Sequence, residues 1–147
     1  MIQCLSKVLE SYLKDYGWNF RSEGTGEWVT GWQGGERSYP LRISVLESWI
    51  IFQIQPFLKI TTDWECWPEI THYLLRLNSN CHMVKIHIDE NEQISLVLEV
   101  FSKNFEYSDF SDALGILGYY ADYLYDEILD FMDKIGFQYS HALNFLT

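Results

Sequence analysis

Positive charge is scarce in this chain of 147 residues. Its 10 lysines and arginines stand against 21 aspartates and glutamates, which gives a formal net charge of −11 at pH 7. Phosphate backbones and anionic membrane surfaces would repel such a chain, so the composition argues against nucleic acid or a membrane as its partner. A basic or apolar protein surface fits this charge better.

Cysteine is also scarce, and long hydrophobic runs are missing. The three cysteines, Cys4, Cys66 and Cys81, are odd in number and widely spread, whereas a disulfide framework needs an even and denser set. Residues 1–7 lack the basic start, apolar run and small-residue cleavage site of a secretory signal. No stretch approaches the ~18 continuous apolar residues of a membrane span. We therefore expect reduced thiols in a cytoplasmic protein.

Hydrophobic side chains, in contrast, are abundant. They make up 48% of the chain, and aromatic residues alone make up 17%. This content excludes disorder, because disordered chains have too little hydrophobic surface to offset the entropy lost on folding. The length suits one domain with a substantial core, and no repeat, linker or low-complexity tract divides it. We predict a single domain over residues 1–147.

Three segments carry apolar residues at helical spacing. The first covers residues 2–17 and ends on a glycine, which takes the left-handed conformation without steric cost. The second covers residues 68–79, and its initial proline suits the first turn of a helix. The third and longest covers residues 108–135, or 111–135 if Ser111 rather than Ser108 is the N-cap.

Five segments alternate apolar and polar side chains, which is typical of half-buried strands. They cover residues 28–33, 38–46, 49–57, 84–88 and 94–101. The turns within each group of strands are short, so the strands should pair antiparallel. Residues 21–26, which include two glycines, are expected to form a loop. The sequence thus predicts an α+β fold of order α-β-β-β-α-β-β-α, with a five-stranded antiparallel sheet packed against helices.

One stretch gives this order a likeness to a known family. The helix that ends in Leu74–Asn80 is followed by a strand ending at Ile88 and Asp89, and then by the strand Ile94–Glu99. This layout resembles the type III secretion chaperone-like fold, and in particular the bacterial YbjN-type proteins. The resemblance implies a small dimeric chaperone or adaptor without enzymatic activity. It brings no catalytic signature to this chain.

Candidate nucleophiles and metal ligands form no motif. The chain has no C-x-x-C or H-x-x-x-H pair, and the adjacent Cys81 and His82 cannot easily hold one ion with good geometry. Neither Cys66 nor Cys81 lies in a nucleophile signature, and Cys81 follows a helix end whose carbonyl groups disfavour a thiolate. We therefore predict no catalytic residue, no metal site and no cofactor.

The last predicted helix carries a cluster of acidic residues. Asp122, Asp126, Asp130 and Asp133 recur at intervals of three or four residues, which places them on one helical face. This face is either a solvated surface opposite the apolar stripe, a docking strip for a basic partner, or a cation site. The sequence leaves these alternatives open.

Apolar residues are more numerous than one sheet face can hold. The predicted core face of the sheet consists of Leu41, Ile43, Ile50, Phe52, Ile54, Val84, Ile86, Ile88, Leu96 and Leu98. The opposite face is expected to hold Trp28, Trp32, Leu46, Trp49, Ile51, Val97 and Phe101. The last helix adds a second strip of Ile116, Tyr119, Tyr120 and Tyr123. Two interpretations of the additional apolar residues remain open. Either a loop, the second helix or the C-terminal tail covers them, or they form a contact surface for a second copy or another protein.

The surplus suggests a function that depends on binding. Our leading hypothesis is a non-enzymatic chaperone-like or adaptor protein, a cytoplasmic homodimer that binds another polypeptide through an apolar sheet face with acidic flanks. The residues predicted to contact the partner are Trp49, Ile51, Val97 and Phe101. The alternative is a protein that binds a small apolar ligand in an aromatic-lined pocket between the sheet and the helices.

Overall fold

An antiparallel sheet in the order β1-β2-β3-β4-β6-β5 forms the centre of the molecule. The structure is a computed structural model that describes residues 2–33, 37–59 and 65–135. Along the chain the elements are α1 (Ile2–Tyr16), β1 (Phe20–Gly24), β2 (Glu27–Gln33), β3 (Ser38–Val45), β4 (Trp49–Leu58), α2 (Trp67–Asn78), β5 (Val84–Ile88), β6 (Ile94–Phe101) and α3 (Tyr107–Lys134). The α+β class and antiparallel pairing predicted from the sequence are confirmed.

The sheet has six strands, so the prediction of five was wrong. Residues 20–24, most of which were expected to lie in a loop, form the edge strand β1 and pair with β2, with Arg21 opposite Val29. The side chains of β1 are mostly exposed. An edge strand with little to bury shows no apolar alternation, which is why the pattern did not reveal it.

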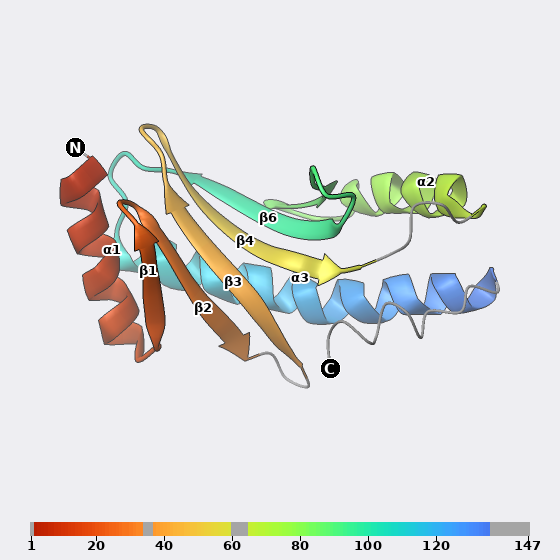
Figure 1. Ribbon diagram of the computed structural model, residues 1–147, viewed down its shortest axis with the longest axis horizontal. Helices are drawn as coiled ribbons and strands as arrows, with labels where there is room; N and C mark the ends of the chain where they lie inside the picture. Colours follow the sequence, from red (N-terminus) through yellow and green to blue (C-terminus); the bar gives the residue numbers. More distant parts are fainter. Residues whose placement is uncertain (1, 34–36, 60–64, 136–147) are drawn as a thin grey trace.

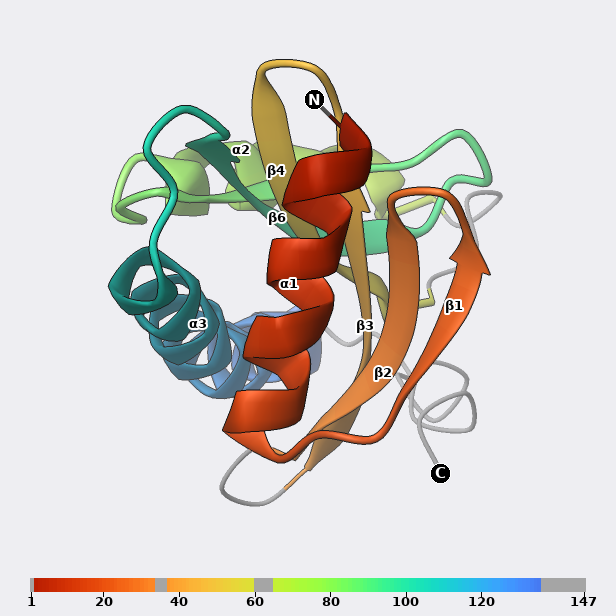
Figure 2. The same cartoon turned by 90° about the vertical axis from the view of Figure 1, so that its left-hand side faces the viewer.

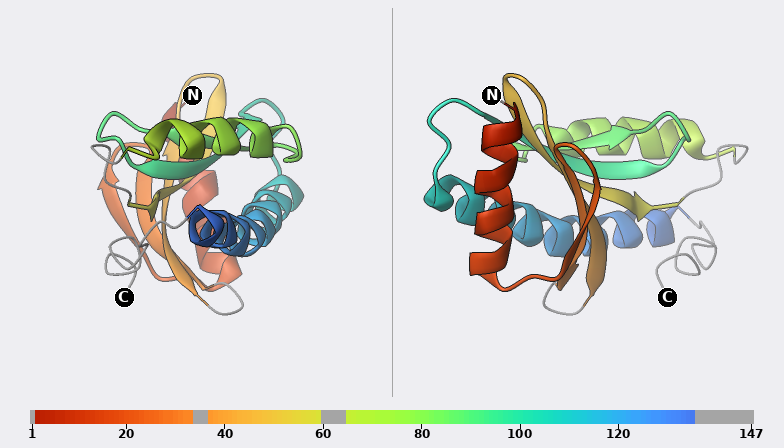
Figure 3. Two further views of the ribbon diagram at one scale, coloured as in Figure 1. Left: turned by 90° about the vertical axis from the view of Figure 1, so that its right-hand side faces the viewer. Right: turned by 60° about the vertical axis from the view of Figure 1, so that its left-hand side comes forward.

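The helices pack mainly on one face of the sheet. In Figure 1, α3 runs behind β3 and β4, and in Figure 2, α1 lies between the start of α3 and strands β2 and β3. The rings of Tyr12 on α1 and Phe110 on α3 are 5.8 Å apart between centroids. Helix α2 lies by β5 and reaches α3, where the rings of Tyr73 and Phe131 stack at 3.9 Å (Figure 3).

The core face of the sheet is almost as predicted. All the expected residues are buried except Ile88, which lies at the end of β5 and is exposed. Trp28 is a correction: it was expected on the opposite face, but it pairs with Ile43 and is buried in the core. Its indole Nε1 donates a hydrogen bond to Glu10 Oε1 at 3.1 Å. Because β2 carries apolar residues on both faces, alternation alone did not decide which face is inside.

Helix α3 begins earlier than predicted. Its N-cap is Glu106, whose side chain accepts from the backbone at the third helical position, while Asp109 accepts from the Glu106 backbone N–H at 2.8 Å. This reciprocal pair is a capping box built from two acids, with neither Ser108 nor Ser111 as the cap. The short turn between the strands predicted at residues 28–33 and 38–46, and the C-terminal tail, lie outside the described residues.

Candidate functional site

The outer face of the sheet lies opposite the core. Its surface is polar where the middle of β4 and β6 lies beside β5. Lys85 Nζ on β5 donates to Glu99 Oε1 on β6 at 2.9 Å. On β4, Gln53 Nε2 lies 3.4 Å from His87 Nε2, and burial lowers the pKa of His87. Lys85 and Glu99 thus pair between neighbouring strands, and Gln53 and His87 meet across the intervening β6, so these four side chains have partners within the chain. Gln93 Oε1 at the β5–β6 turn, in contrast, is buried without a hydrogen-bond partner among the described residues.

Asp89 anchors the polar region at the β5–β6 turn. Its Oδ1 accepts from the backbone N–H groups of Asn91 at 2.8 Å and Gln93 at 3.0 Å, and its Oδ2 accepts from Gln55 Nε2 at 2.6 Å. Burial alone would raise the pKa of Asp89, but these hydrogen bonds to the carboxylate outweigh it and lower the pKa. Asp89 is thus a charged structural group that holds the turn against β4.

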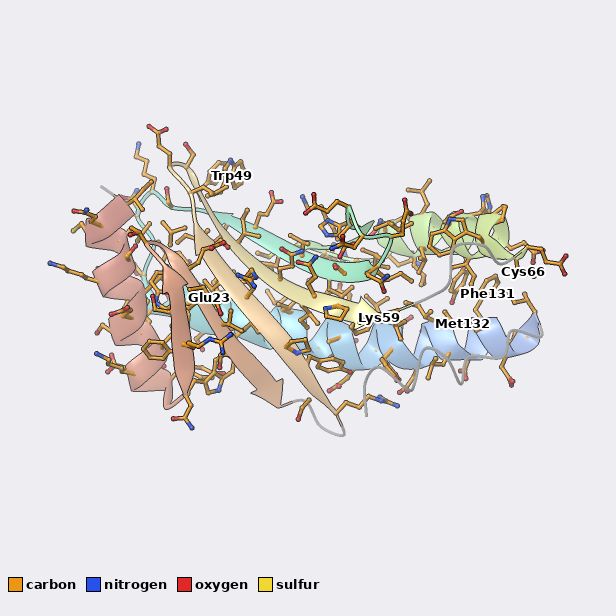
Figure 4. The ribbon with its side chains drawn as sticks, viewed as in Figure 1. Glu23, Trp49, Lys59, Cys66, Phe131 and Met132 are labelled. Atoms are coloured by element: carbon orange, nitrogen blue, oxygen red, sulfur yellow. The ribbon has the colours of Figure 1, made fainter. Side chains whose placement is uncertain are left out.

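The opposite end of the outer face is aromatic and exposed. Trp49 at the start of β4 lies directly across from Phe101 at the end of β6, and their rings stack with centroids 4.6 Å apart. The two side chains remain 38% and 68% exposed. Figure 4 shows Trp49 beside the β3–β4 turn, directed away from α3. This stacked pair is the largest apolar feature of the outer face that the described residues leave uncovered.

The other two residues predicted to contact a partner offer less surface. Ile51 lies on the same face between Ser44 and Glu99 and is half-buried. Val97 lies between Gln53 and Lys85 and is only 3% exposed. Both residues lie on the outer face, as predicted, but Val97 offers almost no surface to a partner because it lies between the long side chains of Gln53 and Lys85. We call the surface formed by Trp49, Ile51 and Phe101 the aromatic patch.

A groove of about 680 Å³ continues from the aromatic patch toward the N-terminus of α1. Its apolar lining comes from three separate parts of the chain: Ile2, Leu5 and Val8 on α1, Leu46 at the β3–β4 turn, and Phe101. Phe101 belongs to both the patch and the groove, so the two form one surface. From the sequence, residues 2–17 were predicted only to form a helix, and none of them was predicted to contribute to a binding surface. The exposure of Ile2 depends on the fold, so the sequence held no signal for this contribution.

The two edges of the sheet differ. At β5, the Asn78 side chain accepts from the backbone N–H of Ile86 at 2.7 Å and donates to its carbonyl oxygen at 3.0 Å. The amide of Asn78 therefore takes the place that a neighbouring strand would occupy. At β1, which pairs only with β2, the described residues include no such cap.

Two of the cysteines, Cys66 and Cys81, are partly buried and free. Burial raises the pKa of the Cys81 thiol, and burial together with Glu69 and Glu65 raises that of Cys66, so neither is an activated nucleophile. No three metal-ligating side chains converge anywhere in the described ranges. Among the helices that the structure describes, none is long and apolar enough to cross a membrane.

The sheet order and helix positions define a protein with the type III secretion chaperone-like fold. Two solved structures support this class. YbjN from E. coli has a TM-score of 0.57 at 14% identity, over 78% of this chain and 87% of its own. A chain of the heterodimeric ExoU–SpcU complex from the type III secretion system of Pseudomonas aeruginosa has a TM-score of 0.54 at 18% identity, over 79% and 93%.

A third solved structure also has a similar fold. An uncharacterized protein from Methanothermobacter thermautotrophicus has a TM-score of 0.51 at 11% identity, over 88% of this chain and 97% of its own. No protein-family model and no curated protein matches the sequence. At these identities the likenesses show the fold alone, and the residues of this chain must carry any argument about function.

Proposed function

We propose that this protein is a non-enzymatic chaperone-like or adaptor protein that binds another polypeptide through the aromatic patch and the adjoining groove. The observation that carries the proposal is the exposed Trp49–Phe101 stack, whose Phe101 also lines an apolar groove. Aromatic side chains offer large contact areas at a small cost in conformational entropy, which is why they are enriched at the centres of interfaces.

The shape of the surface suits an apolar segment flanked by polar or basic residues. Burying one large apolar side chain of the partner in the groove would contribute about 1.5–3 kcal/mol. Acidic residues outnumber basic ones on this protein by 21 to 10, so a partner with basic flanks would be favoured over an acidic one. The fold neighbour from the ExoU–SpcU complex supports the proposal, because its complex is a heterodimer of two polypeptides.

The direct experiment removes the aromatic patch without touching the core. The double variant Trp49→Ser with Phe101→Ser should lose partner capture from the native host, measured by affinity isolation and mass spectrometry. Leu75→Ser is a matched control, because Leu75 is 72% exposed on α2 and lines neither the patch nor the groove. If the double variant captures the same partners as the wild type, the proposal is wrong.

Light scattering on the same variants tests the predicted homodimer, which stays a prediction, as does the cytoplasmic location. A dimer formed through the aromatic patch should dissociate in the Trp49→Ser, Phe101→Ser variant and persist in Leu75→Ser. If both variants remain dimeric, any homodimer uses another surface.

A second candidate function is binding of a small apolar ligand. The groove of about 680 Å³ favours it, because ligand sites commonly measure about 300–1,000 Å³. A thermal-shift screen with lipids and aromatic compounds should then find a ligand that raises the melting temperature. Leu46→Asp, which places a charge in the groove lining, should abolish the shift. A wild-type protein that no such compound stabilises would remove this candidate.

A further inference from the structure

A stripe of exposed side chains follows the outer surface of α3. It consists of Tyr119, Tyr123, Asp126, Asp130 and Asp133, all exposed and spaced four, three, four and three residues apart. This spacing holds the five side chains within one narrow face of the helix, over about 21 Å of its length. We call this face the acidic–aromatic stripe.

The aromatic part of the stripe is open to solvent. Tyr119 and Tyr123 are 66% and 44% exposed, and their rings lie almost parallel, 4° apart, with centroids separated by 6.4 Å. The hydroxyl of neighbouring Tyr120, in contrast, accepts a hydrogen bond from the backbone N–H of His82 at 2.9 Å. Tyr120 therefore joins α3 to the rest of the fold, whereas Tyr119 packs edge-on against the Tyr120 ring, with centroids 5.3 Å apart, and keeps most of its own surface in solvent.

The acidic part of the stripe exceeds the positive charge around it. Among the residues that the structure describes, Arg37 pairs with Asp126, and no cation lies within 4.0 Å of the carboxylates of Asp130 or Asp133. Lys134 follows Asp130 by four residues, so this end of α3 presents two exposed carboxylates with one ammonium group beside them, about two turns from the ring of Tyr123. A partner of opposite charge would relieve the repulsion between the carboxylates.

Helix α3 already binds one arginine of this chain, through the ring of a tyrosine and the carboxylate of an aspartate. The guanidinium of Arg37, just before β3, lies 4.0 Å above the ring of Tyr125, and its Nη2 donates to Asp126 Oδ1 at 2.9 Å. The planar guanidinium suits both contacts at once, because it stacks on an aromatic face and forms hydrogen bonds in its own plane. The stripe includes this Asp126 and adds two further tyrosines and two further aspartates along α3, all exposed.

We propose that the acidic–aromatic stripe binds an arginine-containing basic segment of a partner polypeptide. Guanidinium groups stack on Tyr119 and Tyr123 and pair with the carboxylates of Asp130 and Asp133. Arginine is favoured over lysine, because the ammonium group of lysine lacks the planar fork that stacking and in-plane hydrogen bonding require. This proposal rests on the proposed function in one respect, that the partner is a polypeptide. The stripe would be a second contact surface, separate from the aromatic patch.

The test uses a fluorescent peptide of alternating arginine and serine, about eight residues long so that it spans the stripe when extended. Fluorescence anisotropy compares it with a lysine–serine peptide of equal charge, at salt concentrations of about 0.05 and 0.15 M. The wild-type protein should bind the arginine peptide several-fold more tightly than the lysine peptide. Equal affinities for the two peptides would overturn the proposal.

Matched variants separate the stripe from the general negative charge. Asp130→Asn with Asp133→Asn should weaken binding of the arginine peptide by about tenfold. Glu90→Gln with Glu92→Gln makes the same change in net charge at the exposed β5–β6 turn and should have a much smaller effect. Equal losses in the two double variants would mean that the peptide responds only to net charge, which would overturn the proposal.

Two further variants test the role of the rings and the independence of the site. Tyr119→Leu with Tyr123→Leu keeps apolar, helix-compatible residues but removes the aromatic faces, so it should remove the preference for arginine over lysine. The Trp49→Ser, Phe101→Ser variant should bind the peptide like the wild type even where it fails to capture partners. A preference for arginine that survives loss of both tyrosines would contradict the proposed stacking.

Discussion

The two ends of the outer sheet face differ in whether their main side chains have partners within the chain. At the β5–β6 turn, Asp89 accepts hydrogen bonds from two backbone N–H groups and from Gln55, so its charge is satisfied within the chain. At the other end, Trp49 and Phe101 contact each other but remain open to solvent. At the first end the charged group already has its partners within the chain, whereas the second end leaves apolar surface that a partner could bury.

The two faces of the sheet differ in the same way, because one buries its aromatic side chains and the other exposes them. Phe52 and Phe101 lie on adjacent strands, β4 and β6, yet Phe52 is fully buried and Phe101 is 68% exposed. An identical substitution at these two positions therefore measures how far each phenylalanine serves the fold.

The largest effect is expected for Phe52→Ala. The substitution leaves a cavity in a core that cannot fully collapse, so it should lower the free energy of unfolding by about 3–5 kcal/mol. Chemical denaturation followed by tryptophan fluorescence measures this change. A loss below about 1 kcal/mol would show that the inner face is not the tightly packed core described above.

The second effect concerns the β5 edge. Asn78→Ala leaves the backbone N–H and carbonyl of Ile86 without their partner, which should cost about 1–3 kcal/mol. The uncovered edge should also promote concentration-dependent association, visible by light scattering. Asn80→Ala is the matched control, because Asn80 is exposed and makes only a backbone bond to Leu77 in the described structure. Equal behaviour of the two variants would rule out a capping role for Asn78.

A third, smaller effect depends on pH. Asp89→Asn should lower the free energy of unfolding at pH 7 by about 1–2 kcal/mol, because the amide cannot receive all the hydrogen bonds that the carboxylate accepts. The pKa of Asp89 is lower in the folded than in the unfolded chain. Its carboxylate therefore contributes fully above the unfolded value, and that contribution is lost as the pH falls through the folded value.

The difference between wild type and Asp89→Asn should accordingly narrow below about pH 4. Denaturation curves recorded from neutral to acidic pH measure this narrowing. Glu90→Gln, at an exposed neighbouring position, should show no such dependence. A difference that stays constant down to about pH 2 would contradict the charged structural role of Asp89.

The smallest effect on stability is expected for Phe101→Ala. Most of this side chain is already in water, so the change should stay within about 1 kcal/mol, chiefly from the lost stack with Trp49. Partner capture, however, should fall strongly. A loss of stability close to that of Phe52→Ala would mean that Phe101 serves the fold rather than a partner.

The sequence predicted the elements whose side chains alternate or repeat. The core strands and the exposed Trp49 and Phe101 follow from the period of a strand with one buried face. Strand β1 did not follow, because Arg21, Ser22 and Glu23 are exposed on an edge and leave no apolar signal. Apolar alternation in the sequence marks a strand only where one face is buried, so a strand with exposed side chains is hard to predict.

The parts of the site that depend on distant contacts could not be predicted. Val97 is covered by Gln53 and Lys85, and only the register of three strands brings them together. The groove needs Ile2, Leu46 and Phe101 to meet, although they are far apart in the chain. A one-dimensional pattern can assign a residue to a face, but it does not show which neighbours cover it.

Site-specific photocrosslinking in the native host tests the central claim most directly. A photoreactive phenylalanine analogue placed at position 101 should yield discrete adducts with another polypeptide, whereas the same analogue at position 75, exposed on α2, should not. Adducts of equal yield at both positions, or none at position 101, would contradict the account that the aromatic patch is the surface through which this protein binds its partner.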